Sequence, residues 1–168
     1  MQNTDQIHFQ SRLEIEYLQR RYARATDLLG HADKDSIDEG KRIYHRIFTP
    51  DVEMTVTGNR VDERQSSGID GWLDVVTSAL GPLGPTQHLI GTQLVEIETL
   101  AVDSDNAVSN GRALMRSYVQ AWHDMPDGQV WLFIGTYTSD VRFTPGAGWQ
   151  IWRMNLHRET GELRPMGA

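Results

Sequence analysis

The sequence predicts an α+β domain in which helices come first and a strongly curved, mostly antiparallel sheet follows. Two observations predict this class. The first half of the chain carries apolar residues at helical spacing, and after Pro85 four β-rich stretches follow one another with no helix between them. Consecutive strands joined by short loops pair antiparallel. We therefore expect one bent sheet wrapped against helices on one side.

Three helices are expected before Pro85. Residues 5–29 contain neither proline nor glycine, and their apolar side chains recur at helical spacing. A second helical segment is expected to end near Phe48, closed by Pro50. Residues 69–80 form the third helix, which the glycines and prolines of 81–85 interrupt.

The strands are expected in two groups. Residues 52–57 are rich in β-branched side chains, and a turn at Gly58 and Asn59 predicts a short hairpin that returns through Val61. The four later strands are expected at 88–100, 107–122, 130–143 and 149–157.

Length and composition predict one globular domain over residues 1–168. Hydrophobic residues make up 39% and charged residues 23% of the 168 residues, a balance typical of a folded core. A net charge of −7 leaves no basic surplus for phosphates, so nucleic acid is not expected as a partner. The chain has no cysteine, which excludes disulfides and thiolate chemistry.

The chain shows no signal for a membrane, a cofactor or a metal. Its first ten residues lack the pattern of a secretory signal, and no apolar run approaches the roughly 20 residues that span a bilayer, so a cytoplasmic protein is expected. No glycine-rich nucleotide motif occurs. The histidines outside position 88 do not stand at metal-ligand spacing with carboxylates. They are His8, His31, His45, His123 and His157.

The strand pattern has two interpretations, and the first is a ligand cavity. In 130–143, Trp131, Phe133 and Tyr137 share a face, and both faces of this strand look buried. The strand before it places small, uncharged residues on one side, among them Ala113 and Met115. Small residues beside aromatic ones on a concave sheet leave room for an apolar ligand. The alternative is an ordinary filled core.

His88 and Asp27 are the candidate catalytic residues. His88 begins a strand among apolar neighbours, so it is either a general base in a dry pocket or a core histidine bonded to the backbone. A base of this kind needs a carboxylate on its other ring nitrogen. Asp27 is our choice, although a helical wheel places it nearly opposite the apolar stripe and so predicts a solvated side chain. The other available acids are Asp33, Asp35, Asp38 and Asp51.

Six short motifs in their order along the chain carry a resemblance to a known family. They are Tyr22-Ala-Arg-Ala-Thr-Asp27, Ile47-Phe-Thr-Pro-Asp-Val52, Gly68-Ile-Asp-Gly-Trp72, Thr86-Gln-His-Leu-Ile-Gly91, Gly135-Thr-Tyr-Thr-Ser-Asp140 and Gly148-Trp-Gln-Ile-Trp-Arg153. The pattern resembles the SnoaL-like branch of the nuclear transport factor 2 superfamily, with scytalone dehydratase, bile acid dehydratase and hexachlorocyclohexane dehydrochlorinase among its members. The resemblance covers nearly the whole chain.

The resemblance implies a cone-shaped barrel whose cavity opens between the first helix and the sheet. Asp27 and His88 match the acid and the histidine of the eliminating members, in which the histidine removes a proton from carbon while a neighbouring group leaves. Tyr22 matches a family tyrosine that either donates a hydrogen bond to a substrate oxygen or packs. We expect no cofactor and no metal.

Two family features have no match at the expected places. Scytalone dehydratase uses a second histidine in the following strand, and none lies between 106 and 116. Met154 stands where other members place an arginine, with Arg153 on the opposite face. The inner side of the last strand, Trp152, Met154 and Leu156, looks apolar, so a hydrophobic substrate is expected. The expected substrate-binding residues are Trp72, Ala113, Met115, Trp131, Phe133, Tyr137 and Met154.

Three functions remain open from the sequence. Dehydration by a cofactor-independent lyase comes first, a polyketide cyclase or ketosteroid-type isomerase second, and a non-catalytic ligand-binding or assembly domain third. A homo-oligomer, dimer or trimer, is also expected, because Val119, Leu132 and Ile134 suggest an apolar outer face of the sheet.

Overall fold

The computed structural model describes residues 4–31 and 33–165. In this part of the chain three helices and six strands follow the order α1 (Thr4–Leu29), α2 (Lys34–Ile47), β1 (Phe48–Gly58), β2 (Arg64–Ser67), α3 (Gly68–Leu80), β3 (Thr86–Val102), β4 (Val108–Asp124), β5 (Gln129–Thr144) and β6 (Gly148–Pro165). None of these helices combines the length and the apolar character needed to span a bilayer.

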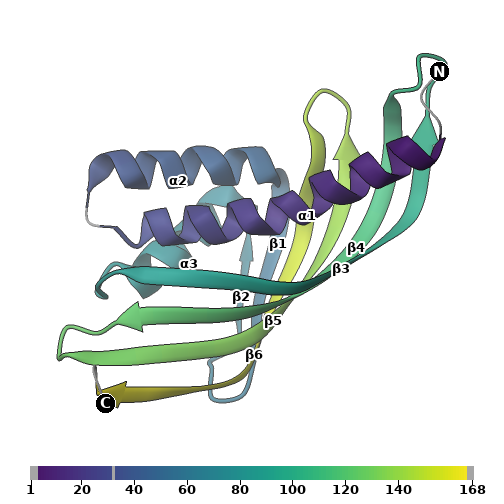
Figure 1. The fold of residues 1–168 in the computed structure, drawn as a ribbon. Helices are drawn as coiled ribbons and strands as arrows, with labels where there is room; N and C mark the ends of the chain where they lie inside the picture. The colour runs from purple at the N-terminus through teal and green to yellow at the C-terminus, as the bar shows by residue number, and fades with distance from the viewer. Residues whose placement is uncertain (1–3, 32, 166–168) are drawn as a thin grey trace.

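The strands form one sheet in the order β2-β1-β6-β5-β4-β3. Strands β3 to β6 pair antiparallel in sequence order, which confirms the prediction from their short connections. Strand β1 runs parallel to β6 and so joins the hairpin of the first half to the large sheet. The sheet is strongly bent but open, with β2 and β3 as its edges (Figure 1). The α+β class and the curved, mostly antiparallel sheet are confirmed.

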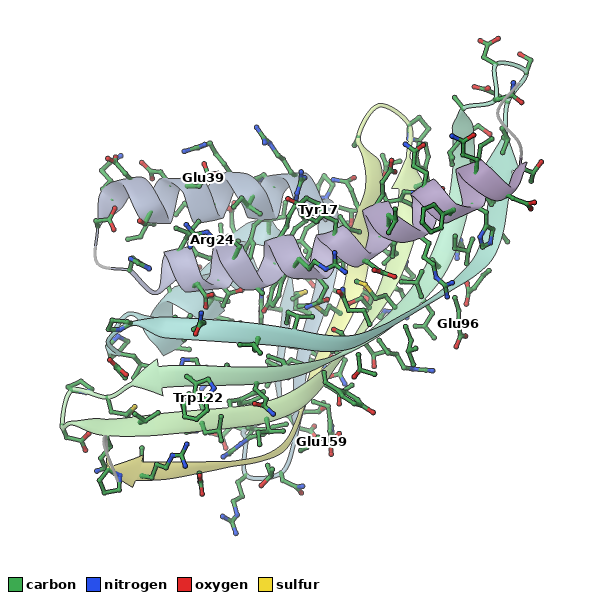
Figure 2. The ribbon with its side chains drawn as sticks, viewed as in Figure 1. Tyr17, Arg24, Glu39, Glu96, Trp122 and Glu159 are labelled. Carbon is green, nitrogen blue, oxygen red and sulfur yellow. The ribbon has the colours of Figure 1, made fainter. Side chains whose placement is uncertain are left out.

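The helices cover the concave side of the sheet. Helices α1 and α2 lie side by side and antiparallel across it, with α3 behind them (Figure 1). Tyr17, Arg24 and Glu39 lie on the outer surface of the two helices (Figure 2). Between the layers, the rings of Tyr22 and Tyr44 stack with their centroids 5.5 Å apart. The core therefore lies between α1 and the sheet, near the C-terminal end of α1.

Strand β4 alternates as its sequence predicts. Its concave-side residues Gly111, Ala113, Met115 and Ser117 are buried, and the residues between them are half-buried or exposed. Gly111 is required because a Cβ there would lie 2.3 Å from the indole of Trp149.

The convex face of the sheet is only half-buried, and three expectations about its two faces are corrected. In β5 the residues Leu132 and Ile134 are half-buried, so the expectation that both faces of this strand are buried is wrong. Val119 is 1% exposed and belongs to the concave-side core, so it is not part of an outer apolar face. Trp152 also changes sides: the guanidiniums of Arg142 and Arg153 stack on it, outside the inner wall. A register shift between Asp140 and Val141 accompanies this change.

Three predicted boundaries are displaced. Helix α2 ends at Ile47, so Pro50 lies inside β1 rather than closing a helix, at an irregular stretch of the pairing with β6. The return strand of the hairpin is β2, and Val61 lies in the turn before it. Strand β6 continues beyond residue 157 to Pro165, paired with the first half of β5. This extension is polar and mostly exposed, so it carries no apolar alternation that would predict a strand.

Candidate active site

A cavity of about 320 Å³ opens between the concave face of the sheet and the helices α1 and α3. Most of its lining is apolar. Helix α3 contributes Trp72, Val75, Val76, Ala79 and Leu80, and the sheet contributes Val56, Ala121, Trp131, Phe133, Tyr137 and Leu156. A space of this size and character suits a small hydrophobic ring compound.

The expected site residues fall into two groups. Tyr22, Trp72, His88, Trp131, Phe133 and Tyr137 all line the cavity. Ala113, Met115 and Met154 lie elsewhere in the core, each at most 3% exposed, and are not among the lining residues. They belong to the packed core between the helices and the sheet.

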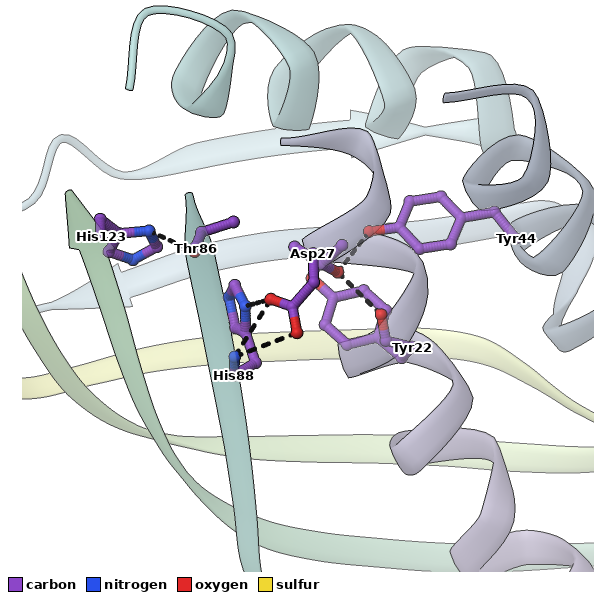
Figure 3. Close-up of polar contacts among 7 residues, drawn as sticks. Tyr22, Asp27, Tyr44, Thr86, His88 and His123 are labelled. Carbon is purple, nitrogen blue, oxygen red and sulfur yellow. Dashed lines mark hydrogen bonds and ion pairs between the residues drawn. The ribbon is translucent and has the colours of Figure 1, made fainter. Parts of the chain in front are cut away.

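Asp27 and His88 are joined directly. The Nδ1 atom of His88 lies 2.7 Å from Oδ1 of Asp27, and the backbone N–H of His88 donates to the same carboxylate at 3.1 Å (Figure 3). The side chain of Asp27 is 15% exposed and that of His88 is 8% exposed. The expectation of a solvated aspartate from the helical wheel is therefore wrong. The last turn of α1 is buried on several sides, between α2 and β3, so its buried face is wider than one stripe.

This pairing determines how the imidazole can act. A carboxylate accepts hydrogen bonds, so Nδ1 of His88 carries the proton toward Asp27. The Nε2 atom is then left with a free lone pair on a ring that lines the cavity. Asp27 itself is not among the cavity-lining residues. The arrangement is that of a general base held and oriented from behind by a carboxylate.

Tyr22 belongs to a cluster of buried hydroxyl groups beside this pair. Burial raises the pKa of Tyr22 above its ordinary value, and hydrogen bonds from neighbouring side chains, Thr26 first, oppose that rise. Thr26 donates through Oγ1 to the carbonyl oxygen of Tyr22, and the same Oγ1 lies 2.7 Å from the hydroxyl of Tyr44 (Figure 3). Burial also raises the pKa of Tyr137 well above its ordinary value. These phenols stay protonated at neutral pH and can donate hydrogen bonds.

His123 is a cavity residue that sequence reasoning missed. It lies at the end of β4, opposite Thr86 in register, and its Nδ1 is 2.7 Å from Thr86 Oγ1. Its ring stacks on Trp131 and meets the ring of His88 edge-on at 5.6 Å. No histidine lies between residues 106 and 116, where the family resemblance implies a second one. The alternation of β4, continued from Met115 through Ala121, places His123 on the concave face and is the signal that could have found it.

The protonation state of His123 follows from its surroundings. Burial, the largest cause, and the charged form of His88 together lower its pKa from 6.5 to about 4, and Asp27 opposes both. His123 is therefore neutral at pH 7, with one N–H donor.

The open end of the cavity carries charged residues that the sequence did not predict there. Arg60, Asp62 and Arg64, which are exposed, and Arg158, which is half-buried, line the cavity beside Val61. Within residues 4–31 and 33–165 no group of three histidine, aspartate or glutamate side chains could hold a metal ion.

A model of one protein family, the SnoaL-like domain, matches residues 8–155 of the chain. The chain belongs to the SnoaL-like family. This match runs from α1 into β6 and ends just before Leu156 and Arg158, the cavity residues of β6. The resemblance from six short motifs is thereby confirmed at the level of the family. No curated protein sequence matches the chain.

Solved structures show the same fold. Kfla4162 from Kribbella flavida is 22% identical, with a TM-score of 0.67, and the match covers 92% of this chain and 95% of that one. A protein named "Putative Scytalone Dehydratase" from Novosphingobium aromaticivorans is 16% identical, with a TM-score of 0.64 over 95% of this chain and 98% of that one. A nuclear transport factor 2-like protein with a cystatin-like fold, also from Novosphingobium aromaticivorans, is 18% identical, with a TM-score of 0.62 over 94% and 91%.

Proposed function

We propose that the chain is a cofactor-independent lyase that dehydrates a small hydrophobic ring substrate in the cavity. The observation that carries the proposal is the Asp27–His88 pair, because its free Nε2 belongs to a ring that lines the cavity. The family membership and the dehydratase name of one structural relative support the same class of reaction.

The chemical step needs one base and one leaving group. His88 Nε2 removes a proton from a carbon next to a carbonyl group, and the negative charge of Asp27 stabilises the imidazolium that forms. The electrons of the broken C–H bond form a C=C bond as the C–O bond on the adjacent carbon breaks. The imidazolium then gives its proton to the departing hydroxide, which leaves as water. His88 ends the cycle neutral, so no cofactor or metal is needed.

Neutral side chains in the cavity wall can donate hydrogen bonds to the oxygen atoms of the substrate. In the tautomer that this step requires, the Thr86 hydroxyl donates to Nδ1 of His123, and Nε2–H of His123 donates toward a substrate oxygen. Because His123 is neutral at pH 7, it does not compete with His88 for the proton. Tyr22, whose pKa is raised by burial, is a second donor in the wall, through its phenolic hydroxyl.

A β-hydroxy ring ketone tests this chemistry. The probe is 3-hydroxy-1-tetralone, because loss of water gives 1-naphthol, whose fluorescence reports turnover. We expect turnover by the wild type, and loss by a factor on the order of 10³ in His88→Ala and in Asp27→Asn, since the mutated pair lacks the base or its orienting charge. Folding of each variant is checked by circular dichroism, and binding of the probe by calorimetry.

The other outcomes separate the competing functions. Exchange of the carbon-bound proton without loss of water, still dependent on His88, favours isomerase or cyclase chemistry over dehydration. Equal binding by the wild type and both variants, with neither turnover nor proton exchange in any, contradicts catalysis and favours a ligand-binding domain.

A further inference from the structure

The open end of the cavity is rich in arginine although the chain as a whole is acidic. Arg60, Arg64 and Arg158 line it together with one carboxylate, Asp62, whereas the whole chain has a net charge of −7. None of these three arginines forms an ion pair with any residue in 4–31 or 33–165. Three guanidinium groups against one carboxylate make this end of the cavity cationic.

Arg158 lines the cavity, and part of its guanidinium has no hydrogen-bond partner among the described residues. Its Nη1 donates to the carbonyl oxygens of Arg60 at 3.0 Å and Asn59 at 3.5 Å. Its Nε is buried and has no hydrogen-bond partner in the described part of the chain. A buried donor without an acceptor costs free energy, and an incoming acceptor recovers it. The Nε–Nη2 edge is the side of guanidinium that a carboxylate binds with two parallel hydrogen bonds.

The backbone around Arg158 leaves room for its guanidinium. A Cβ at position 161 would lie 3.0 Å from Nη2 of Arg158 and 2.3 Å from the carbonyl oxygen of Leu132. Glycine at 161 lets the arginine lie against β6 at the cavity, while the turn carbonyls of Asn59 and Arg60 hold its far side. The group is therefore positioned before any ligand binds.

Another arginine of the same strand shows the contrast. Arg153, on the convex side of β6, donates to Glu53 at 3.1 Å, lies 3.7 Å from Asp140 and stacks on Trp152. Among the described residues, carboxylates therefore pair with the arginine outside the cavity, whereas Arg158, which lines it, has no carboxylate partner.

We propose that the ligand of this cavity carries a carboxylate or a similar planar oxyanion, which Arg158 and Arg64 bind at the open end while its apolar ring occupies the space next to His88. This inference rests on the proposed function for the location of the ligand and adds the anionic group to it. The sequence leads us to expect a hydrophobic substrate with few polar contacts. The inference instead expects an amphipathic ring compound that carries an acid group.

Calorimetry with two matched compounds tests the inference without requiring turnover. The probes are 2-naphthoate and the neutral 2-naphthamide, which share the ring and differ in charge. The wild type should bind the naphthoate about tenfold more tightly than the naphthamide, the preference that one charge-assisted contact supplies. Arg158→Gln and Arg64→Gln should each weaken naphthoate binding by about fivefold or more and leave naphthamide binding unchanged. Arg153→Gln, the matched control, should keep the full preference.

Arg64→Gln keeps the test valid if Arg158→Gln fails to fold. Arg64 is exposed and forms no ion pair within the described residues, so its replacement should not disturb folding. Equal affinity of the wild type for both compounds, or a preference that survives in the folded Arg64→Gln/Arg158→Gln double variant, overturns the anion inference alone. Failure of both compounds to bind the wild type overturns the ligand cavity itself, and the proposed function with it.

Discussion

Thr86 and His123 face each other in the register of β3 and β4, and a hydrogen bond of 2.7 Å joins the hydroxyl of Thr86 to Nδ1 of His123. His123 is 3% exposed, so folding removes its ring from water. Burial, the largest cause, and the charge of His88 together bring its pKa to about 4, against an opposing effect of Asp27.

This depressed pKa makes stability depend on pH. An unfolded histidine binds a proton near pH 6.5, whereas folded His123 resists protonation until about pH 4. The stabilisation is complete above pH 6.5 and is lost as the pH falls from 6.5 to 4, on the order of 3 kcal/mol in total. Urea unfolding between pH 7 and 4 measures it. His123→Gln should show a flatter profile over this window, and an identical pH profile in the variant contradicts the buried neutral histidine.

The buried hydroxyl pair of Thr26 and Tyr44 should contribute measurably to stability. Tyr44 is fully buried, and its hydroxyl lies 2.7 Å from Thr26 Oγ1. Tyr44→Phe removes the tyrosine hydroxyl and leaves Thr26 Oγ1 without this hydrogen bond. The free energy of unfolding should fall by about 1–2 kcal/mol. Tyr17→Phe is the control, since Tyr17 is 50% exposed and its change should stay within about 0.5 kcal/mol. Equal stability of both variants contradicts the role of this hydrogen bond.

Gly111 should not tolerate a side chain. A Cβ at this position would meet Trp149 Cη2 at 2.3 Å, and the rigid indole can move only by displacing its neighbours in the core. Gly111→Ala should lower the free energy of unfolding by about 1–3 kcal/mol. Gly91→Ala is the matched control on the neighbouring strand, where no atom of the described residues lies within 4 Å of the added Cβ. Thermal unfolding compares the two, and a Gly111→Ala melting temperature equal to that of Gly91→Ala contradicts the packing described.

Asp27 should determine the tautomer of His88. In the neutral wild type the carboxylate accepts from Nδ1–H, so ¹⁵N NMR should find the proton on Nδ1 alone. In Asp27→Asn the amide can either accept or donate, so both tautomers should become populated while the fold is kept. Wild-type spectra with the proton on Nε2 are incompatible with the proposed base.

Sequence patterns predicted the regular parts of the fold well. Helix α1, the four long strands and their antiparallel pairing all follow from local periodicity and short connections. Periodicity did not predict the parallel pairing of β1 with β6, which joins segments about 100 residues apart. It also missed the late part of β6, because that strand is held by backbone pairing and not by an apolar face.

The candidate site was predictable only in part. Asp27 has the wrong phase for the apolar stripe of α1, so the resemblance to a family and not the helical wheel selected it. His123 was missed, although the alternation of β4, continued to the end of the strand, places it on the concave face. Arg158 could not be placed at the cavity, because the predicted last strand ended before it. The environment of its Nε, which has no partner among the described residues, depends on tertiary contacts that no local pattern encodes.

Exchange of a carbon-bound proton in ²H₂O tests the central claim most directly, because it needs the base and no leaving group. The probe is 2-tetralone, whose carbons next to the carbonyl group exchange slowly in buffer, followed by ¹H NMR with binding confirmed by calorimetry. The account predicts that the wild type accelerates exchange and that His88→Ala binds 2-tetralone without accelerating it. Binding by the wild type with exchange at the buffer rate, or equal acceleration by His88→Ala, contradicts the assignment of His88 as the base.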